Sequence, residues 1–311
     1  MLRPRAAGRA ALHARPAGRL CCGPGVRSRG GGGPGSARLT LPPAVPCGGR
    51  PRGKQILGML HLQPLPGTPY HEPGSLARTV QTAVDSARAL QDGGADGCLV
   101  QTVERVYGVA DESDPARVAA AARVVHAVVE ATGPGFVVGV QLMRNAIRAS
   151  LAVARVAGAG FVRAGTLVGA TMTEFGLVHA DPMGVMEYRN KIDARGVQII
   201  ADVDSDAFRW FGEARSAGDV ARRALKVGAD AVAVGHPDED EALRKIHSVR
   251  REAPGACVFL SGHTTHANAS RLLAAADGAF VGSCLEEGGW GGRIDVRRVR
   301  DYVRVVRELE A

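Results

Sequence analysis

From Gln55 onward, short continuous apolar segments alternate with longer segments whose apolar positions recur at helical spacing. The short segments contain few polar residues, a pattern typical of strands buried on both faces of a parallel sheet. They predict eight strands, at Gln55–Leu60, Gly97–Gln101, Phe136–Gln141, Phe161–Gly165, Val197–Val203, Ala231–Gly235, Cys257–Gly262 and Gly278–Ser283.

The segments between these strands predict eight helices, at Ser75–Gln91, Pro115–Ala131, Asn145–Ala157, Pro182–Ala194, Ala217–Val227, Asp238–Glu252, Ala267–Ala275 and Asp295–Glu310. A Gly-Ala phrase recurs where a helix meets the next strand, beginning at Gly94, Gly158 and Gly228, which indicates a repeated βα unit. Eight such units predict an α/β fold, a single (β/α)8 TIM barrel over residues 55–311. A doubly wound open sheet is the alternative, but no G-x-G-x-x-G motif follows the first strand.

The charge pattern separates residues 1–54 from the rest of the chain. This segment holds eleven Lys and Arg residues and no Asp or Glu, and it is rich in Gly, Pro and Ala. It predicts a disordered basic leader, and we interpret it as a mitochondrial transit peptide; a low-complexity extension is the alternative. Removing these eleven residues leaves 28 basic against 31 acidic ones, so the positive net charge is no argument for binding nucleic acid. No apolar run is long enough to span a bilayer.

In a TIM barrel the chemistry lies at the C-terminal ends of the strands. Here those ends carry polar residues in every unit: His61; Gln101 and Glu104; Gln141, Arg144 and Asn145; Arg163 and Thr166; Asp202 and Asp204; His236 and Asp238; Ser261 and His263; Ser283 and Glu286. We expect Asp202 to act as an acid/base group with His61 as its partner, and Arg144 and Asn145 to assist.

Asp202 ends a buried apolar strand, so its carboxylate must be paired, bind a cation or exchange a proton. Asp204 follows two residues later on the same expected side, and the two could hold Mg²⁺ as cofactor. The alternative is an ion pair between Asp202 and Arg163 on the neighbouring strand.

Many TIM barrels bind phosphate after the seventh and eighth strands, through backbone N–H groups exposed by glycine. Ser261 and Gly262 end the seventh predicted strand, and Gly282 and Ser283 end the eighth. These residues, with Arg163 and Thr166, are the expected binding site for a small phosphorylated molecule. Glu286 would repel such an anion if it faced inward.

Several motifs together resemble the BtpA/SgcQ family. They are Gly58-Met-Leu-His-Leu-Gln-Pro-Leu-Pro-Gly-Thr-Pro69, Asp92-Gly-Gly-Ala-Asp-Gly97, Gly139-Val-Gln-Leu-Met-Arg-Asn145, Phe161-Val-Arg163, Gly169-Ala-Thr-Met-Thr-Glu-Phe-Gly-Leu177, Ile200-Ala-Asp-Val203 and Asp277-Gly-Ala-Phe-Val-Gly-Ser283. The resemblance covers residues 55–306 in order. It implies a barrel like those that bind phosphate, a role in photosystem I biogenesis, mitochondrial location in eukaryotic relatives, and a homodimer.

The chain departs from the family pattern at five positions: Gln101, Gln141, Asp204, His236 and Glu286. Relatives usually carry Glu at the first of these positions and Lys at the last. Two hypotheses follow. Either the barrel is an enzyme or binding protein for a small phosphorylated metabolite, or it is a non-catalytic assembly or stability factor built on a degenerate barrel.

Overall fold

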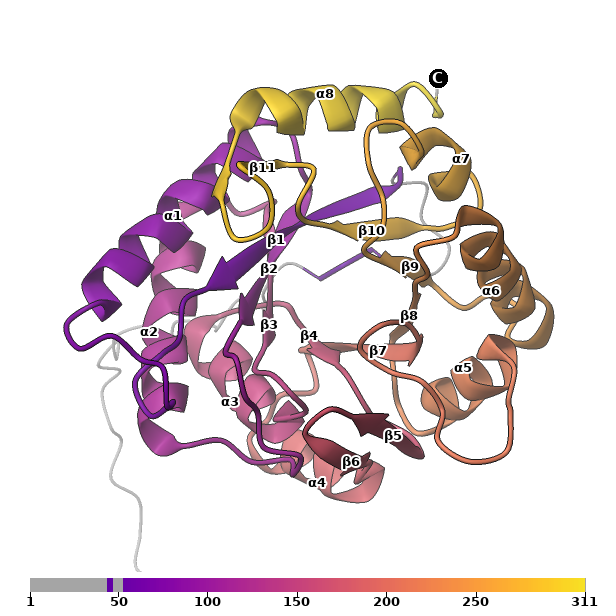
Figure 1. Cartoon of the computed structure of the whole chain (residues 1–311), viewed down its shortest axis with the longest axis horizontal. Coiled ribbons are helices and arrows are strands. Elements are labelled where there is room, and N and C mark those ends of the chain that lie inside the picture. Colours follow the sequence, from indigo (N-terminus) through magenta and orange to yellow (C-terminus); the bar gives the residue numbers. More distant parts are fainter. Residues whose placement is uncertain (1–43, 47–52, 311) are drawn as a thin grey trace, which may run out of the picture. The chain divides into compact units, whose positions relative to one another are not determined.

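The computed structural model describes residues 44–46 and 53–310 of the chain and shows a closed barrel of eight parallel strands (Figure 1). Around the barrel the strands follow the order β1-β2-β3-β4-β7-β8-β9-β10. Their bounds are Gln55–Leu62 (β1), Gly97–Thr102 (β2), Val137–Gln141 (β3), Phe161–Ala164 (β4), Gln198–Asp204 (β7), Ala231–Val234 (β8), Val258–Ser261 (β9) and Gly278–Val281 (β10). The predicted TIM barrel is confirmed.

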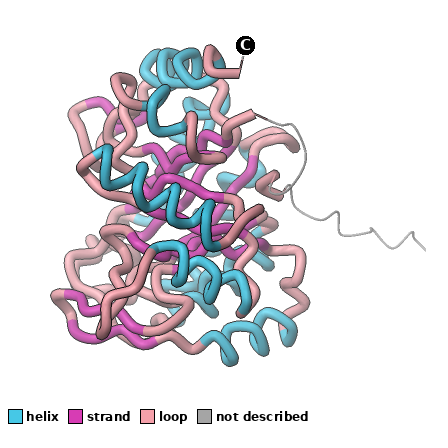
Figure 2. The backbone as a smooth tube through the Cα atoms, turned by 90° about the vertical axis from the view of Figure 1, so that its right-hand side faces the viewer, coloured by secondary structure: helices cyan, strands magenta, loops and turns pink. Residues whose placement is uncertain are grey.

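Helices alternate with these strands and cover the outside of the barrel (Figures 1 and 2). They are Leu76–Asp92 (α1), Pro115–Ala131 (α2), Ile147–Ala157 (α3), Pro182–Lys191 (α4), Ala217–Lys226 (α5), Glu239–Glu252 (α6), Ala269–Leu273 (α7) and Val296–Arg307 (α8). Side-chain N-caps start several of them; Asp114, for example, accepts the N–H of Ala116 at 2.8 Å, beside Pro115 in the first turn. Within the described residues, no helix is both long and apolar enough to cross a membrane.

Two short hairpins follow barrel strands and were not predicted. One joins Ala170–Thr173 (β5) to Gly176–His179 (β6), and the other joins Glu286–Glu287 (β11) to Arg293–Ile294 (β12). The second hairpin turns through Gly288, Gly289 and Gly291, whose φ angles of 79°, 92° and 82° lie in the left-handed region that favours glycine. Both hairpins therefore stand at the C-terminal end of the barrel, where the sequence places the chemistry.

The barrel interior is filled by apolar side chains from alternate strand positions. A buried cluster joins Leu57, Met59, Leu99, Val137, Phe161, Ile200, Ala231, Ala233, Cys257, Phe259 and Phe280. Val45 belongs to the same cluster, and its backbone N–H and C=O both bond to the Gln198 side chain, at 2.6 and 3.0 Å. Most of the predicted leader, residues 1–43 and 47–52, lies outside the described residues. The domain boundary at residue 54 stays a prediction.

Candidate functional site

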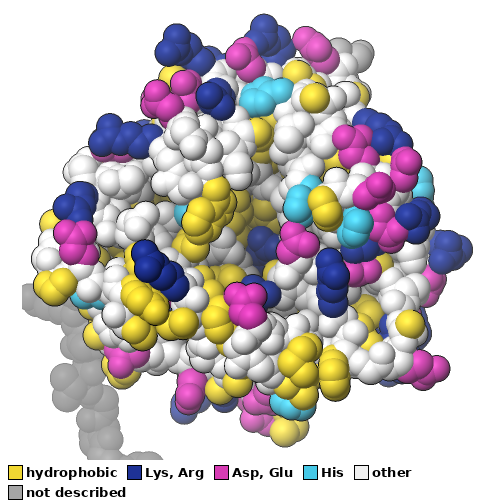
Figure 3. Space-filling model, viewed as in Figure 1, with side chains coloured by type: hydrophobic (Ala, Val, Ile, Leu, Met, Phe, Trp, Pro, Cys, Tyr) yellow, Lys and Arg dark blue, Asp and Glu magenta, His cyan; other side chains and the backbone are white. Residues whose placement is uncertain are grey.

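A layer of mostly polar positions lies above the apolar interior, one at or just beyond the C-terminal end of each barrel strand. Because side chains on a strand alternate between faces, residues two or four positions after an interior one also point inward. This rule gives His61, Gln101, Gln141, Arg163, Asp202, Gly235, Ser261 and Gly282. The molecule is hollowed over the barrel on the face seen in Figure 3. Six of the eight positions carry polar side chains, so the barrel mouth is chemically distinct from its interior.

His61 is held by Glu286, a partner 225 residues away. The Nδ1 atom of His61 lies 3.0 Å from Oε1 of Glu286, and the two side chains are only 9% and 2% exposed. The other carboxylate oxygen of Glu286 accepts the N–H of Gly291 at 2.6 Å. Since a carboxylate can only accept when ionised, Nδ1 carries the proton in this bond and Nε2 remains for other partners. Glu286 therefore fixes both the tautomer of His61 and the turn of the β11–β12 hairpin.

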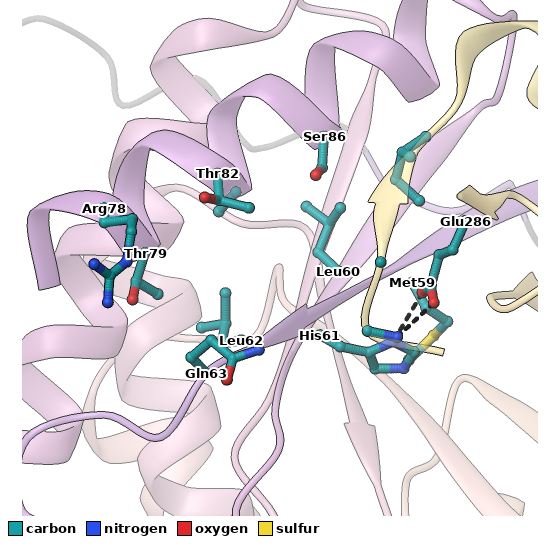
Figure 4. Close-up of a pocket in the computed structure, with 14 residues that line it drawn as sticks. Met59, Leu60, His61, Leu62, Gln63, Arg78, Thr79, Thr82, Ser86 and Glu286 are labelled. Atoms are coloured by element: carbon teal, nitrogen blue, oxygen red, sulfur yellow. Dashed lines mark hydrogen bonds and ion pairs between the residues drawn. The ribbon is translucent and has the colours of Figure 1, made fainter. Parts of the chain in front are cut away.

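Two cavities adjoin this His–Glu pair. The smaller, of about 210 Å³, lies between β1 and α1, and Thr79, Thr82 and Ser86 line it from the helix side (Figure 4). The larger, of about 610 Å³, is lined by His61 together with side chains from the β1–α1 and β2–α2 loops and by Trp290. His61 thus borders the space that a small molecule could fill.

Arg163 and Asp202 form a buried ion pair inside the mouth. The guanidinium donates to both carboxylate oxygens, Nε to Oδ2 at 2.9 Å and Nη2 to Oδ1 at 3.0 Å. Oδ1 also accepts the hydroxyls of Ser205 at 2.8 Å and Ser261 at 3.1 Å, and the Asp202 side chain is 0% exposed. The guanidinium carbon lies 4.9 Å from the centre of the Phe280 ring. Asp202 is therefore saturated by donors, and it is Glu286, not Asp202, that partners His61.

The two carboxylates of the predicted magnesium pair, Asp202 and Asp204, turn to different partners. The register of β7 against β8 shifts between these two residues, so the expected shared side is lost. Asp204 turns instead to helix α6, where its Oδ1 accepts from Nζ of Lys245 at 2.8 Å. No group of three or more His, Cys, Asp or Glu residues within the described parts of the chain is placed to hold a metal ion. Binding of Mg²⁺ stays a prediction.

The ends of β2 and β3 are occupied by neutral amides. Nε2 of Gln101 donates to Oε1 of Gln141 at 2.7 Å, and the strand register pairs the two residues directly. Just beyond, Arg117 donates to both carboxylate oxygens of Glu104, from Nε to Oε1 at 3.0 Å and from Nη2 to Oε2 at 2.9 Å. Burial raises the pKa of Glu104, and the Arg117 charge opposes that rise. These groups order the β2–α2 loop beside the larger cavity.

Three of the predicted site residues join loops to one another. The Asn145 side chain accepts the N–H of Thr166 at 2.7 Å and donates to its carbonyl at 3.2 Å, with both residues 2% exposed. Arg144 donates to the carbonyls of Asp206 and Ala207 at 3.4 and 3.2 Å. It lines a separate cavity of about 400 Å³ under the β5–β6 hairpin. These contacts position the rim loops rather than place side chains beside His61.

The ends of β9 and β10 have the glycine-rich geometry that the sequence predicts. Gly262 and His263 both adopt positive φ, 87° and 56°, and a Cβ atom on Gly262 would meet open space. Gly282 lies beside the His–Glu pair, since a Cβ atom on it would sit 3.5 Å from Cε1 of His61. Ser283 follows in a turn, and its carbonyl accepts the N–H of Glu286 at 3.3 Å. The structure therefore brings one end of the expected phosphate site next to His61.

A sequence model of the BtpA family matches residues 52–308. The chain belongs to the BtpA family. A protein of Archaeoglobus fulgidus is 30% identical over 258 residues, which are 82% of this chain and 99% of that protein. The photosystem I biogenesis protein BtpA of Synechocystis is 29% identical over 82% of this chain and 87% of its own length.

A further relative and two solved structures are also similar to this chain. A Caenorhabditis elegans protein named as mitochondrial is 26% identical, over 82% of this chain and 94% of its own length. Thiamine phosphate pyrophosphorylase from Pyrococcus furiosus superposes with a TM-score of 0.50 at 16% identity, covering 83% and 97% of the two chains. Tryptophan synthase from M. tuberculosis superposes with a TM-score of 0.53 at 14% identity, over 82% of this chain and 93% of its own. At such low identity the two structures show a shared barrel fold only.

Proposed function

We propose that the barrel mouth binds a small phosphorylated metabolite and that His61 exchanges a proton with it. The observation that carries this proposal is the 3.0 Å bond between His61 Nδ1 and Glu286 Oε1 at the wall of two cavities. A carboxylate that orients an imidazole leaves the second ring nitrogen ready to act as general acid or base. Glu286, which would repel an anion if it faced inward, instead directs its two carboxylate oxygens to His61 and Gly291.

The phosphate part of the proposal rests on the neighbourhood of His61. A Cβ atom added to Gly282 would lie 3.5 Å from Cε1 of His61, so an anion held against the backbone at that strand end would lie beside His61. The larger cavity also contains Arg78 and Arg105. Arg78 is paired with Glu72 at 2.6 Å, whereas Arg105 has no carboxylate partner among the described residues. Arg105 therefore remains available to pair with an anionic ligand.

Asp202 has a different role in this proposal. Its oxygens are already filled by Arg163, Ser205 and Ser261, so it is a positioning residue that holds the floor of the mouth. The guanidinium of Arg163 is likewise committed to Asp202 and is 8% exposed. The network fixes the polar layer on which a ligand would rest.

A thermal-shift panel tests the proposal directly. Full-length protein is heated with sugar phosphates and nucleotides, with and without Mg²⁺, and its Tm is compared with that of Gly282→Ala and Gly135→Ala. The new methyl group at Gly282 meets ordinary contacts near 3.5 Å, so the variant folds but covers the backbone beside His61. Gly135 has no neighbour within 4 Å of an added Cβ and lies outside the mouth, which makes it a matched control.

The proposal expects at least one phosphorylated ligand to raise the Tm of the unaltered chain and of Gly135→Ala, but not of Gly282→Ala. A panel in which no ligand raises the Tm of the unaltered chain contradicts it. Equal shifts in all three proteins contradict the placement of the phosphate at the end of β10.

A second candidate is a non-catalytic assembly factor. It is favoured by the neutral Gln101–Gln141 pair, which points an amide instead of a titratable group into the mouth from each of β2 and β3, and by the name of the Synechocystis relative. If this candidate is correct, His61→Asn co-purifies with the same partners as the unaltered chain, and no ligand of the panel raises the Tm.

We also propose that the protein is located in mitochondria. The acid-free, Arg-rich segment and the mitochondrial name of the C. elegans relative support this location. Mass spectrometry of the mature protein from fractionated cells is expected to find an N-terminus downstream of Met1 in the mitochondrial fraction. An intact Met1 refutes processing of a transit peptide.

A further inference from the structure

We propose that the larger cavity beside His61 binds a planar aromatic ring, so that the phosphorylated ligand is a nucleoside monophosphate. This inference rests on the proposed function and names its substrate class. The observation behind it is that Tyr70 and Trp290, two of the few aromatic residues of the chain, line the same cavity as His61 and Arg105.

Both aromatic side chains are unusually exposed for residues of their size. Tyr70 is 48% exposed and Trp290 is 65% exposed, although the apolar residues of the barrel around them are almost completely buried. An exposed aromatic ring at the wall of a cavity offers a flat surface on which another ring can stack. The ring of a sugar phosphate offers only its C–H face, which covers less of these side chains than the flat π-face of a nucleobase.

The position of Trp290 is tied to the His–Glu pair. Its ring centre lies 5.3 Å from that of His61, and the adjacent Gly291 donates its N–H to Glu286 at 2.6 Å. One carboxylate therefore holds both the acid/base group and the turn that carries the indole. A ring stacked on Trp290 would place the rest of the ligand within reach of His61.

Charge and volume agree with a nucleotide. Arg105 lies over the Tyr70 ring, 5.1 Å from its centre, and can pair with a phosphate at the same wall. The cavity of about 610 Å³ falls within the usual range for small-molecule sites, roughly 300–1,000 Å³. The site thus combines a stacking surface, a cation without a carboxylate partner and an oriented imidazole.

The test compares ligands that differ in one part. Affinities of AMP, GMP, CMP, UMP, ribose 5-phosphate and adenosine are measured by calorimetry for the full chain, for Trp290→Ala and for Phe211→Ala. Phe211 is a matched control, since it is 50% exposed but does not line the cavity. We expect at least one nucleotide to bind ten-fold or more tighter than ribose 5-phosphate. Trp290→Ala should weaken that nucleotide roughly 5- to 150-fold, the range for loss of one base–aromatic stack, while Phe211→Ala leaves it unchanged.

The possible failures are distinguishable. If ribose 5-phosphate binds as tightly as every nucleotide, or Trp290→Ala has no effect on nucleotide affinity, the aromatic subsite is overturned and the phosphorylated-metabolite proposal stands. If adenosine binds as tightly as AMP, the phosphate contribution is overturned. If none of the phosphorylated compounds binds, this inference fails together with the proposed function.

Discussion

Replacing Asp202 by Ala should destabilise the protein more than it alters the chemistry of the site. The substitution removes the partner of Arg163, a cation that is 8% exposed, and deletes the acceptor of two hydroxyl groups. Four hydrogen bonds of 2.8 to 3.1 Å are lost from a side chain that is 0% exposed. An uncompensated charge in such a place costs about 3–5 kcal/mol, a large share of a typical total stability of about 5–15 kcal/mol.

Equilibrium urea unfolding, followed by circular dichroism, measures this cost. Asp202→Asn serves as the shape-conserving control, because it keeps an acceptor oxygen but removes the charge. The double variant Arg163→Met/Asp202→Leu should lose less stability than Asp202→Ala, since it leaves no buried charge without a partner. A loss below about 1 kcal/mol in Asp202→Ala, or a double variant that loses as much stability as Asp202→Ala, would refute the reasoning.

Three further outcomes are expected. Gly139→Ala should lower the free energy of unfolding in urea by about 1–3 kcal/mol, because the added Cβ would overlap the buried ring of Phe161. Adding Phe161→Leu to that variant should restore part of the lost stability. Full stability of Gly139→Ala alone would contradict the packing. Hydrogen bonds and charges, first that of Arg223, lower the pKa of Asp219 to about 2. The stability that ionised Asp219 contributes is present above its ordinary pKa of 3.8 and is lost as the pH falls toward 2. The stability that Asp219→Asn loses relative to the unaltered chain should therefore shrink between pH 5 and pH 2. Tyr302→Phe leaves the buried Thr264 hydroxyl without its 2.6 Å partner and should cost about 1–3 kcal/mol, measured by the same unfolding assay.

The barrel was predictable because parallel strands buried on both faces leave continuous apolar runs in the sequence. The predicted strand Ala231–Gly235, for example, matches Ala231–Val234 to one residue. The same property hid the side-chain orientation, since a strand without alternation does not show which residues face inward. Asp202 and Asp204 were therefore assigned to one side, although the register shift in β7 separates them.

The partner of His61 was beyond sequence reasoning for a different reason. Glu286 reaches it only because β10 closes the barrel against β1, a pairing of residues more than 200 positions apart. Nothing in the composition of the glycine-rich stretch from Gly288 to Gly292 indicates that it turns a hairpin beside the site. The ion pair of Asp202 with Arg163, by contrast, was an open alternative that the structure bears out.

The most direct test of the account is the turnover of a phosphorylated metabolite by the unaltered chain and by His61→Asn. The Asn side chain retains an N–H donor for Glu286 and removes the second ring nitrogen, so the fold is kept while the acid/base group is lost. The account predicts that kcat falls roughly 10²- to 10⁴-fold while KM changes little. An equal kcat in the two proteins, or the absence of any turnover by the unaltered chain, would contradict it.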